Sequence, residues 1–157
     1  MIIHSEQEML DFAENFTWAG DAFLARTPGG APATTGEDAA AGPAQSNVIE
    51  LIGDVGAGKT TFVRGLAKGL GIKEPVVSPS FTISKSYALP SGGFLVHYDF
   101  YRLNDPGIML DDLEENLKNP KNIIVIEWGE SVKDILPKNH TKIEIKYNDD
   151  NSREIIL

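Results

Sequence analysis

The apolar positions of this chain follow two spacings, one typical of helices and the other of strands. Residues 5–8 fit a capping box, and apolar positions then recur at helical spacing, which predicts a first helix ending near Arg26. A second helical pattern covers residues 60–70, before a glycine that favours a helix stop. A shorter acidic stretch predicts a third helix over residues 111–118.

Short apolar runs between turn residues predict the strands. The run at 123–126 is continuously apolar, as expected of a strand buried on both faces of a parallel sheet. The C-terminal residues alternate, turn and return, which predicts a β-hairpin. The fold class is therefore α/β, a three-layer P-loop NTPase-like domain whose mostly parallel central sheet is extended by antiparallel strands. The predicted strands are residues 48–52, 83–88, 94–98, 123–126, 141–147 and 153–157.

Residues 27–46 break both spacings. They consist mainly of Ala, Gly, Pro and Thr and contain almost no large apolar side chain, so they cannot contribute to a core. We expect a mobile surface insertion within a single domain spanning residues 1–157.

Composition excludes several kinds of function. The chain has no cysteine, which rules out disulfides and thiolate chemistry. Its net charge of −9 repels polyanions, so any role on nucleic acid is expected to be indirect. There is neither a membrane-spanning apolar run nor an export signal, which predicts a cytoplasmic protein. The three histidines, His4, His97 and His140, lack metal-binding spacing and are expected to be structural.

The most specific motif is G-D-V-G-A-G-K-T at residues 53–60, between a predicted strand and a predicted helix. Its glycines let bare backbone wrap a phosphate chain, and the following helix directs its N–H groups and positive dipole end toward it. Lys59 is placed to reach the outer phosphates, and the Thr60 hydroxyl to bind Mg²⁺. The sequence therefore predicts a site for a nucleoside triphosphate.

Two predicted strands end in an acid. Glu127 follows residues 123–126 and resembles a Walker B acid, while Asp99 follows the strand at 94–98. Ser80 and Thr82 belong to a hydroxyl-rich segment that has the character of a switch near the γ-phosphate. We expect these side chains to support the metal and the reacting phosphate.

Several motifs extend beyond the phosphate loop: residues 53–66, S-P-S-F-T at 78–82, H-Y-D-F-Y-R-L at 97–103, I-E-W at 126–128 and S-R-E at 152–154. Together they resemble the TsaE (formerly YjeE) family of bacterial tRNA threonylcarbamoyladenosine biosynthesis ATPases. Ser80 stands where this family more often has Thr, and Gly129 where it often has Pro. The insertion at 27–46 is also longer than the link expected there.

The resemblance implies an ATPase that works with the TsaD and TsaB proteins, which transfer a threonylcarbamoyl group to tRNA adenosine 37. ATP hydrolysis would drive or reset that complex, and tRNA would be met only through it. Lys59, Asp99 and Glu127 would be catalytic, and Thr60 and Glu127 would hold Mg²⁺. The nucleotide would contact Ser5, Gly53, Asp54, Val55, Gly56, Ala57, Gly58, Lys59, Thr60, Thr61, Ser80, Thr82, Asp99, Glu130 and Arg153.

Two other functions use the same loop. A small-molecule kinase would need a basic lid, but the four arginines are dispersed and residues 27–46 carry no basic side chain. A GTP-dependent switch would need the guanine-reading N-K-x-D pattern, which is absent, although a non-catalytic nucleotide-binding module needs no such motif. The acceptor of the phosphate and the effect of Glu127→Ala on turnover separate these alternatives.

Overall fold

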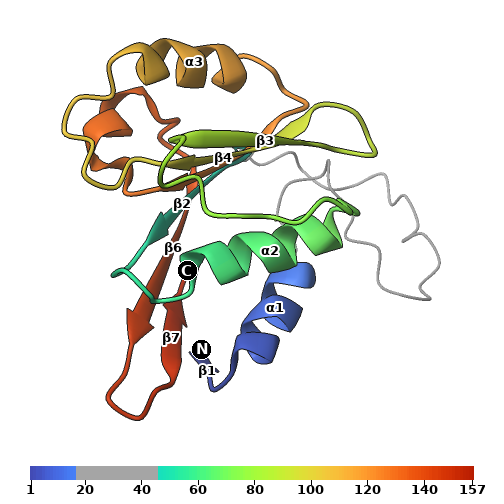
Figure 1. The fold of residues 1–157 in the computed structure, drawn as a ribbon, viewed down its shortest axis with the longest axis vertical. Helices are drawn as coiled ribbons and strands as arrows, with labels where there is room; N and C mark the ends of the chain where they lie inside the picture. The colour runs from blue at the N-terminus through green and yellow to red at the C-terminus, as the bar shows by residue number, and fades with distance from the viewer. Residues whose placement is uncertain (17–45) are drawn as a thin grey trace, which may run out of the picture.

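The computed structural model describes residues 1–16 and 46–157, which build one mixed sheet between two layers of helices (Figure 1). The strands are β1 (Ile2–Ile3), β2 (Val48–Ile52), β3 (Ser84–Ala88), β4 (Phe94–Asp99), β5 (Ile123–Glu127), β6 (Thr141–Tyr147) and β7 (Arg153–Ile156). The helices are α1 (Glu6–Glu14), α2 (Lys59–Gly69), α3 (Ile108–Leu117) and the 3-10 helix η1 (Gly129–Ile135).

The strand order is β1-β7-β6-β2-β5-β4-β3. The four strands β6, β2, β5 and β4 run parallel, and antiparallel strands extend them on both edges. The predicted fold class is confirmed, including the C-terminal hairpin of β6 and β7. The sequence did not predict β1, because two residues are too short for a periodic pattern; β1 forms only through its pairing with β7.

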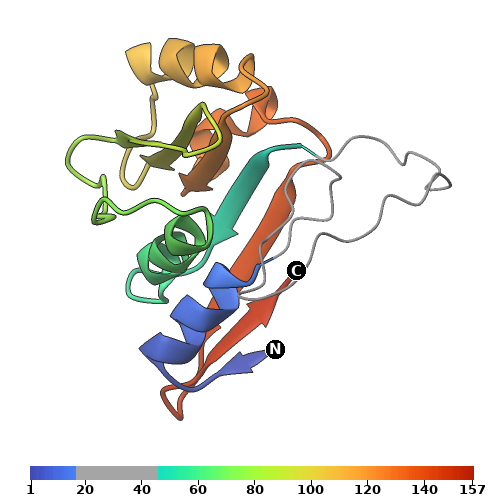
Figure 2. The same ribbon diagram turned by 90° about the vertical axis from the view of Figure 1, so that its right-hand side faces the viewer.

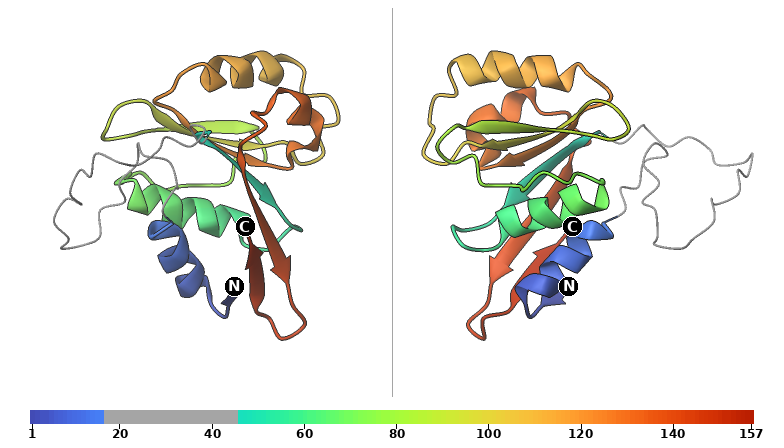
Figure 3. Two further views of the ribbon diagram at one scale, coloured as in Figure 1. Left: turned by 180° about the vertical axis from the view of Figure 1, so that it is seen from behind. Right: turned by 45° about the vertical axis from the view of Figure 1, so that its right-hand side comes forward.

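Each face of the sheet carries its own core. Alternate residues of β2 point to opposite faces, so that Ile49 and Leu51 pack under α1 and α2, while Val48 packs on the side of α3 and η1. Figures 2 and 3 show α1 and α2 together on one side of the sheet and α3 with η1 on the other. The continuous apolar run at residues 123–126 of β5 follows from this burial on both faces, whereas Glu50 interrupts the apolar residues of β2.

Helices α1 and α2 touch through backbone. A Cβ atom at Gly65 would lie 2.5 Å from the carbonyl oxygen of Leu10, and one at Gly69 would lie 2.3 Å from that of Glu14. Two glycines one helical turn apart therefore let the α1 backbone rest directly on the helix that follows the phosphate loop.

The first helix is shorter than its sequence pattern predicts. It ends at Glu14, with Asn15 as its C-cap, and does not run on through Phe16 toward Arg26. The rest of the expected helix and residues 27–45 of the expected insertion lie outside the described residues. Within the described ranges, no helix has the length and apolar character needed to cross a bilayer.

Candidate phosphate-binding site

The loop between β2 and α2 has a conformation that needs its glycines. Gly56 and Gly58 adopt φ angles of 84° and 109°, which L side chains rarely tolerate. Gly53, at a φ of 152°, lies against β6, where a Cβ atom would be 2.4 Å from the Ile145 carbonyl oxygen. Gly58 is also the N-cap of α2, so the free N–H groups of that helix open at the end of the loop.

The Lys59 ammonium lies inside the loop. Its Nζ donates to the carbonyl oxygens of Gly53 and Asp54, at 2.8 and 2.9 Å, and is 3.9 Å from Glu127 Oε2. An ammonium has three N–H donors, so one is left for a further acceptor. Burial lowers the Lys59 pKa, and the nearby negative charges, foremost Glu127, only partly oppose this shift.

Glu127 joins the loop to the sheet. It is the last residue of β5, lies opposite Leu51 of β2, and is only 4% exposed. Its Oε1 accepts a hydrogen bond from the Thr60 hydroxyl at 3.3 Å and contacts His97 Nε2 at 2.9 Å. The carboxyl ends of adjacent parallel strands meet at the same edge of a sheet, and this explains how an acid 67 residues away reaches the Thr60 side chain.

Asp99 lies directly beside Glu127 because β4 and β5 pair in parallel with these two residues in register. Its carboxylate accepts hydrogen bonds from the Ser80 hydroxyl at 2.5 Å and from the Tyr101 backbone N–H at 3.0 Å. Ser80 also shares a hydrogen bond with the Ser78 hydroxyl at 2.7 Å. The hydroxyl-rich segment therefore connects to the site through Ser80.

Thr82 is not part of this connection. Its hydroxyl donates to the Ser84 carbonyl at 3.2 Å, at the start of β3, and the side chain is exposed. Ile83, which follows Thr82, has a φ of 67°. This left-handed conformation turns the chain between Thr82 and β3. The structure thus separates the two hydroxyls that the motif presents together.

Three expected nucleotide residues have local partners. The Ser5 hydroxyl caps α1 by accepting from the Glu8 N–H at 3.1 Å. The exposed Glu130 pairs with Lys133 of the same 3-10 helix. Arg153 donates to the Asn151 carbonyl and its guanidinium stacks on a tyrosine ring. Of α1, Met9 reaches the loop, since its methyl group would be 3.5 Å from a Cβ atom at Gly58.

The remaining expected contacts belong to the loop itself. Val55 is 69% exposed at its tip, while the Ala57 side chain is buried in the core shared with α1 and α2. Thr61 is half-buried and is the third residue of α2. Such contacts to a phosphate chain run through backbone N–H groups, so the burial of these side chains does not affect them.

Two aromatic residues line the site that sequence reasoning did not assign to it. Trp128 has a left-handed φ of 59°, which brings its ring within 4.7 Å of Lys59 Nζ and 5.0 Å of the Tyr101 ring. Within the described residues, Arg102 forms no ion pair with Asp99; its guanidinium lies over Tyr101 at 4.8 Å instead. Left-handed backbone at a tryptophan has no sequence signal, so Trp128 could be placed only by the structure.

His97 is the main residue that sequence reasoning missed. It is fully buried on β4, and its contact with Glu127 puts it next to the predicted metal-binding acid. The alternation in His97-Tyr98-Asp99 does signal that the first and third side chains share a face. Knowing that this face meets Glu127 requires the order of the strands.

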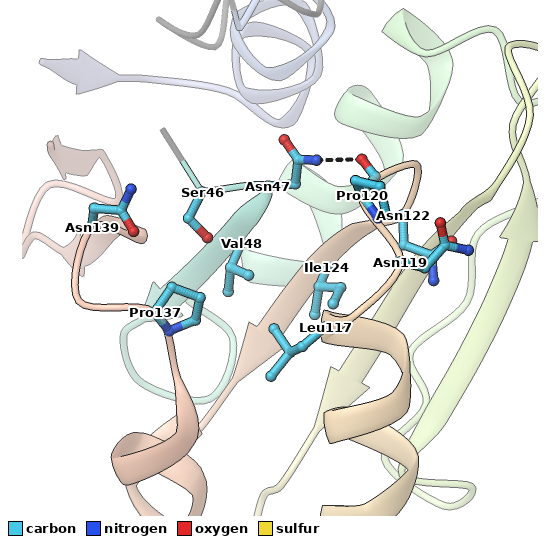
Figure 4. Close-up of a pocket in the computed structure, with 10 residues that line it drawn as sticks. All are labelled: Ser46, Asn47, Val48, Leu117, Asn119, Pro120, Asn122, Ile124, Pro137 and Asn139. Atoms are coloured by element: carbon cyan, nitrogen blue, oxygen red, sulfur yellow. Dashed lines mark hydrogen bonds between the residues drawn. The ribbon is translucent and has the colours of Figure 1, made fainter. Parts of the chain in front are cut away.

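A separate cavity of about 260 Å³ lies at the opposite end of the parallel strands (Figure 4). Val48 and Ile124, near the starts of β2 and β5, line it together with Asn47, Asn122 and Pro137. Asn47 is tied to the Pro120 carbonyl by a hydrogen bond of 2.7 Å. None of the residues predicted from the phosphate loop or the strand-end acids belongs to this cavity.

Fold and site together define a P-loop NTPase-like α/β protein. The family model of threonylcarbamoyl adenosine biosynthesis protein TsaE matches residues 30–155, and the chain belongs to this family. It is 40% identical over 114 residues to the tRNA threonylcarbamoyladenosine biosynthesis protein TsaE of Nostoc sp., covering 69% of this chain and 67% of the relative. The corresponding Bacillus subtilis protein is 42% identical over 112 residues, with coverages of 69% and 67%.

A solved structure resembles this fold. The crystal structure of YdiB from Bacillus subtilis superimposes with a TM-score of 0.62 at 30% sequence identity. The match covers 99% of this chain and 80% of the other. The predicted resemblance to the TsaE family is therefore confirmed.

Proposed function

We propose that this protein is a Mg²⁺-dependent ATP hydrolase of tRNA N6-threonylcarbamoyladenosine synthesis, which drives or resets a TsaD–TsaB transfer complex. The observation that carries the proposal is the position of Glu127, whose carboxylate lies between the Thr60 hydroxyl and the Lys59 ammonium. A phosphate loop, a hydroxyl and a strand-end acid in one place are the parts that phosphoryl transfer requires.

The side chains present fit Mg²⁺. Thr60 and Glu127 offer oxygen atoms only, and Mg²⁺ is usually held by one or two carboxylates with phosphate and water completing its shell. When bound, the ion would neutralise charge on the phosphates.

The chain's own groups would divide the remaining work. The loop N–H groups and the free donor of Lys59 would bind the phosphates. Asp99, held by Ser80 and the Tyr101 N–H, would orient the attacking water. Ser80 would then report the state of the γ-phosphate to the segment at 78–82. Ser5, Thr82, Glu130 and Arg153 stay predictions that rest on the family resemblance.

A partner would complete the catalytic site. Among the described arginines, Arg64 pairs with Glu6, Arg102 stacks on Tyr101, and Arg153 lies at the hairpin. None of them is placed as an arginine finger, so we expect slow hydrolysis by the protein alone.

The family's pathway and the charge of the chain support the remaining assignments. The matched relatives are named for tRNA threonylcarbamoyladenosine biosynthesis, which supports TsaD and TsaB as partners and a cytoplasmic location. The net charge of −9 supports contact with tRNA only through that complex. The single shared sheet supports one ATPase domain spanning residues 1–157.

The test measures release of inorganic phosphate from ATP by the wild-type protein and Glu127→Ala, with and without TsaD and TsaB. We expect stimulation by the partners and loss of turnover in the variant. ATP binding with turnover unchanged in Glu127→Ala would contradict hydrolysis and favour a binding module. Transfer of phosphate to a small acceptor instead of water would favour a kinase.

A further inference from the structure

His97 and Asp99 point to the same face of β4, two residues apart. The parallel register places His97 opposite Val125 and Asp99 opposite Glu127. His97 is therefore the diagonal neighbour of Glu127, a separation that a long side chain spans. Its Nε2 lies 2.9 Å from Glu127 Oε1, and the Thr60 hydroxyl of α2 lies 3.3 Å from the same oxygen atom.

The hydrogen bond determines which ring nitrogen carries a proton. An ionised carboxylate only accepts hydrogen bonds, so Nε2 of His97 must donate. The other nitrogen, Nδ1, is buried and has no hydrogen-bond partner among the described residues. The ring is thus oriented by a single polar contact, the one with Glu127.

A purely structural side chain at this position would be apolar. Leu95 precedes His97 on the same face of β4, and Val125 lies opposite it; both are fully buried. Burying a ring nitrogen without a partner costs free energy that a leucine would avoid. The imidazole is therefore matched to the carboxylate of Glu127 rather than to its apolar surroundings.

We propose that His97 is a positioning residue of the divalent-cation site: its Nε2–H holds Glu127 Oε1, so that the carboxylate faces the Thr60 hydroxyl. This inference rests on the proposed Mg²⁺ site. A carboxylate oxygen has two lone pairs, so Oε1 can accept from both His97 and Thr60, while Oε2 keeps its lone pairs for the site. Residues that orient a metal ligand in this way typically contribute 10–100-fold, by order of magnitude, to metal affinity.

The chain offers a matched control on the other face of the sheet. His140 Nε2 contacts Glu50 Oε2 at 3.0 Å, and its Nδ1 contacts the Pro137 carbonyl at 2.6 Å. This pair joins the same two side-chain types, with a further carbonyl contact at His140, and neither contact involves the phosphate loop. His140→Leu therefore reports what losing a histidine–glutamate pair does to folding alone.

The experiment measures ATP affinity of the wild-type protein, His97→Leu, His97→Gln and His140→Leu, without divalent cation and across a Mg²⁺ titration. For His97→Leu we expect unchanged affinity without metal and a Mg²⁺ requirement raised by about 10-fold or more. A glutamine amide reaches the position of Nε2, so His97→Gln restores most of the difference. His140→Leu matches the wild type in both conditions.

Two results of this titration would overturn the inference. One is that His97→Leu needs the same Mg²⁺ concentration for ATP binding as the wild type. The other is that His97→Leu loses ATP affinity equally with and without metal, which marks a structural role. If wild-type ATP binding shows no Mg²⁺ dependence, the proposed function fails as well. A wild-type protein that needs Mg²⁺ while His97→Leu behaves identically rejects only the role of His97.

A measurement on the wild-type chain covers the case in which His97→Leu does not fold. Nitrogen NMR of ¹⁵N-labelled histidine distinguishes the two ring tautomers. We expect a protonated Nε2 and a bare Nδ1 at His97, with the Nε2 resonance shifting when Mg·ADP is added and the His140 resonances unmoved. A proton on Nδ1 with a bare Nε2 would overturn the inference.

Discussion

Two histidine–glutamate pairs lie on opposite faces of one sheet, a buried pair at Glu127 and a part-buried pair at Glu50, and they differ in how many of their polar atoms have partners. Around Glu50, His140 has partners for both ring nitrogens and the Lys142 ammonium approaches to 3.4 Å. Around Glu127, the histidine has only the carboxylate, and the Thr60 hydroxyl contact is long at 3.3 Å. A complete network is typical of structural support, while incomplete polar contacts are typical of a site that acts on a ligand.

The largest expected difference between the two pairs comes from removing their carboxylates. Glu127→Ala should lower ATP turnover on the order of 100-fold or more, because it removes the carboxylate proposed to hold the Mg²⁺ that neutralises charge on the phosphates. Glu50→Ala should leave turnover unchanged and reduce the free energy of unfolding by about 1–3 kcal/mol. Phosphate-release assays and urea unfolding of both variants check this; equal turnover in the two would remove the distinction.

Asp99→Ala tests a second carboxylate of the candidate site, beside Glu127. Its carboxylate is held by Ser80 and the Tyr101 N–H, so we expect turnover to fall about 100-fold while ATP affinity changes little. Turnover and equilibrium titration of the same preparation separate the two effects. Loss of binding as large as the loss of turnover would contradict a role in orienting water.

Lys59→Ala should act chiefly on binding. One charge-assisted hydrogen bond to phosphate contributes about 1.5–3 kcal/mol, so ATP affinity should fall roughly 10–100-fold. Isothermal titration calorimetry with ATP measures this affinity. Lys142→Ala removes the cation beside Glu50 and is the control; it should bind ATP as the wild type does, and a similar loss there would indicate a general charge effect.

His140→Leu should change stability alone. Losing both ring contacts leaves the Pro137 carbonyl and Glu50 with fewer partners, and we expect a reduction of about 1–3 kcal/mol in the free energy of unfolding. Chemical denaturation measures this, and ATP titration of the same variant should match the wild type. A weakened ATP affinity would mean that the two faces are coupled.

The smallest expected effect is on the pH dependence of the site. Burial lowers the Lys59 pKa, so the ammonium loses its charge, and ATP affinity falls, at a lower pH than the ordinary value of 10.5 implies. The unfolded chain binds this proton more tightly, so between the two pKa values the contribution of Lys59 to the free energy of unfolding rises with pH. Lys59→Arg, which stays charged, should show no such fall in affinity.

Much of this fold could be predicted because its main elements have local signals. The strand at 48–52 and the helix after the glycine-rich loop appear where periodicity and the motif place them. The 3-10 helix Gly129–Ile135 was not predicted, since its two apolar residues, Val132 and Ile135, are too few to establish a period. It begins after Trp128, whose left-handed backbone is not signalled by the residue type.

The candidate site, like the fold, could be predicted only in part from local signals. The motif and the strand-end acids led to Lys59, Thr60, Asp99 and Glu127, which the structure brings together. The part played by His97 depends on β4 lying next to β5, a long-range arrangement that periodicity does not encode.

The contact of α1 with Gly65 and Gly69 has a mechanical consequence. The atoms nearest to these two glycines are the α1 backbone and the Ala13 methyl group, with no longer side chain that could adjust, so α1 cannot tilt against α2 without a steric clash. Because α2 starts at the phosphate loop and α1 adjoins β1 at the sheet edge, a displacement of the loop helix would be passed as a rigid unit to the N-terminal strand. An alanine at either glycine would push α1 and α2 apart, and a displacement of α2 would then no longer be passed to β1.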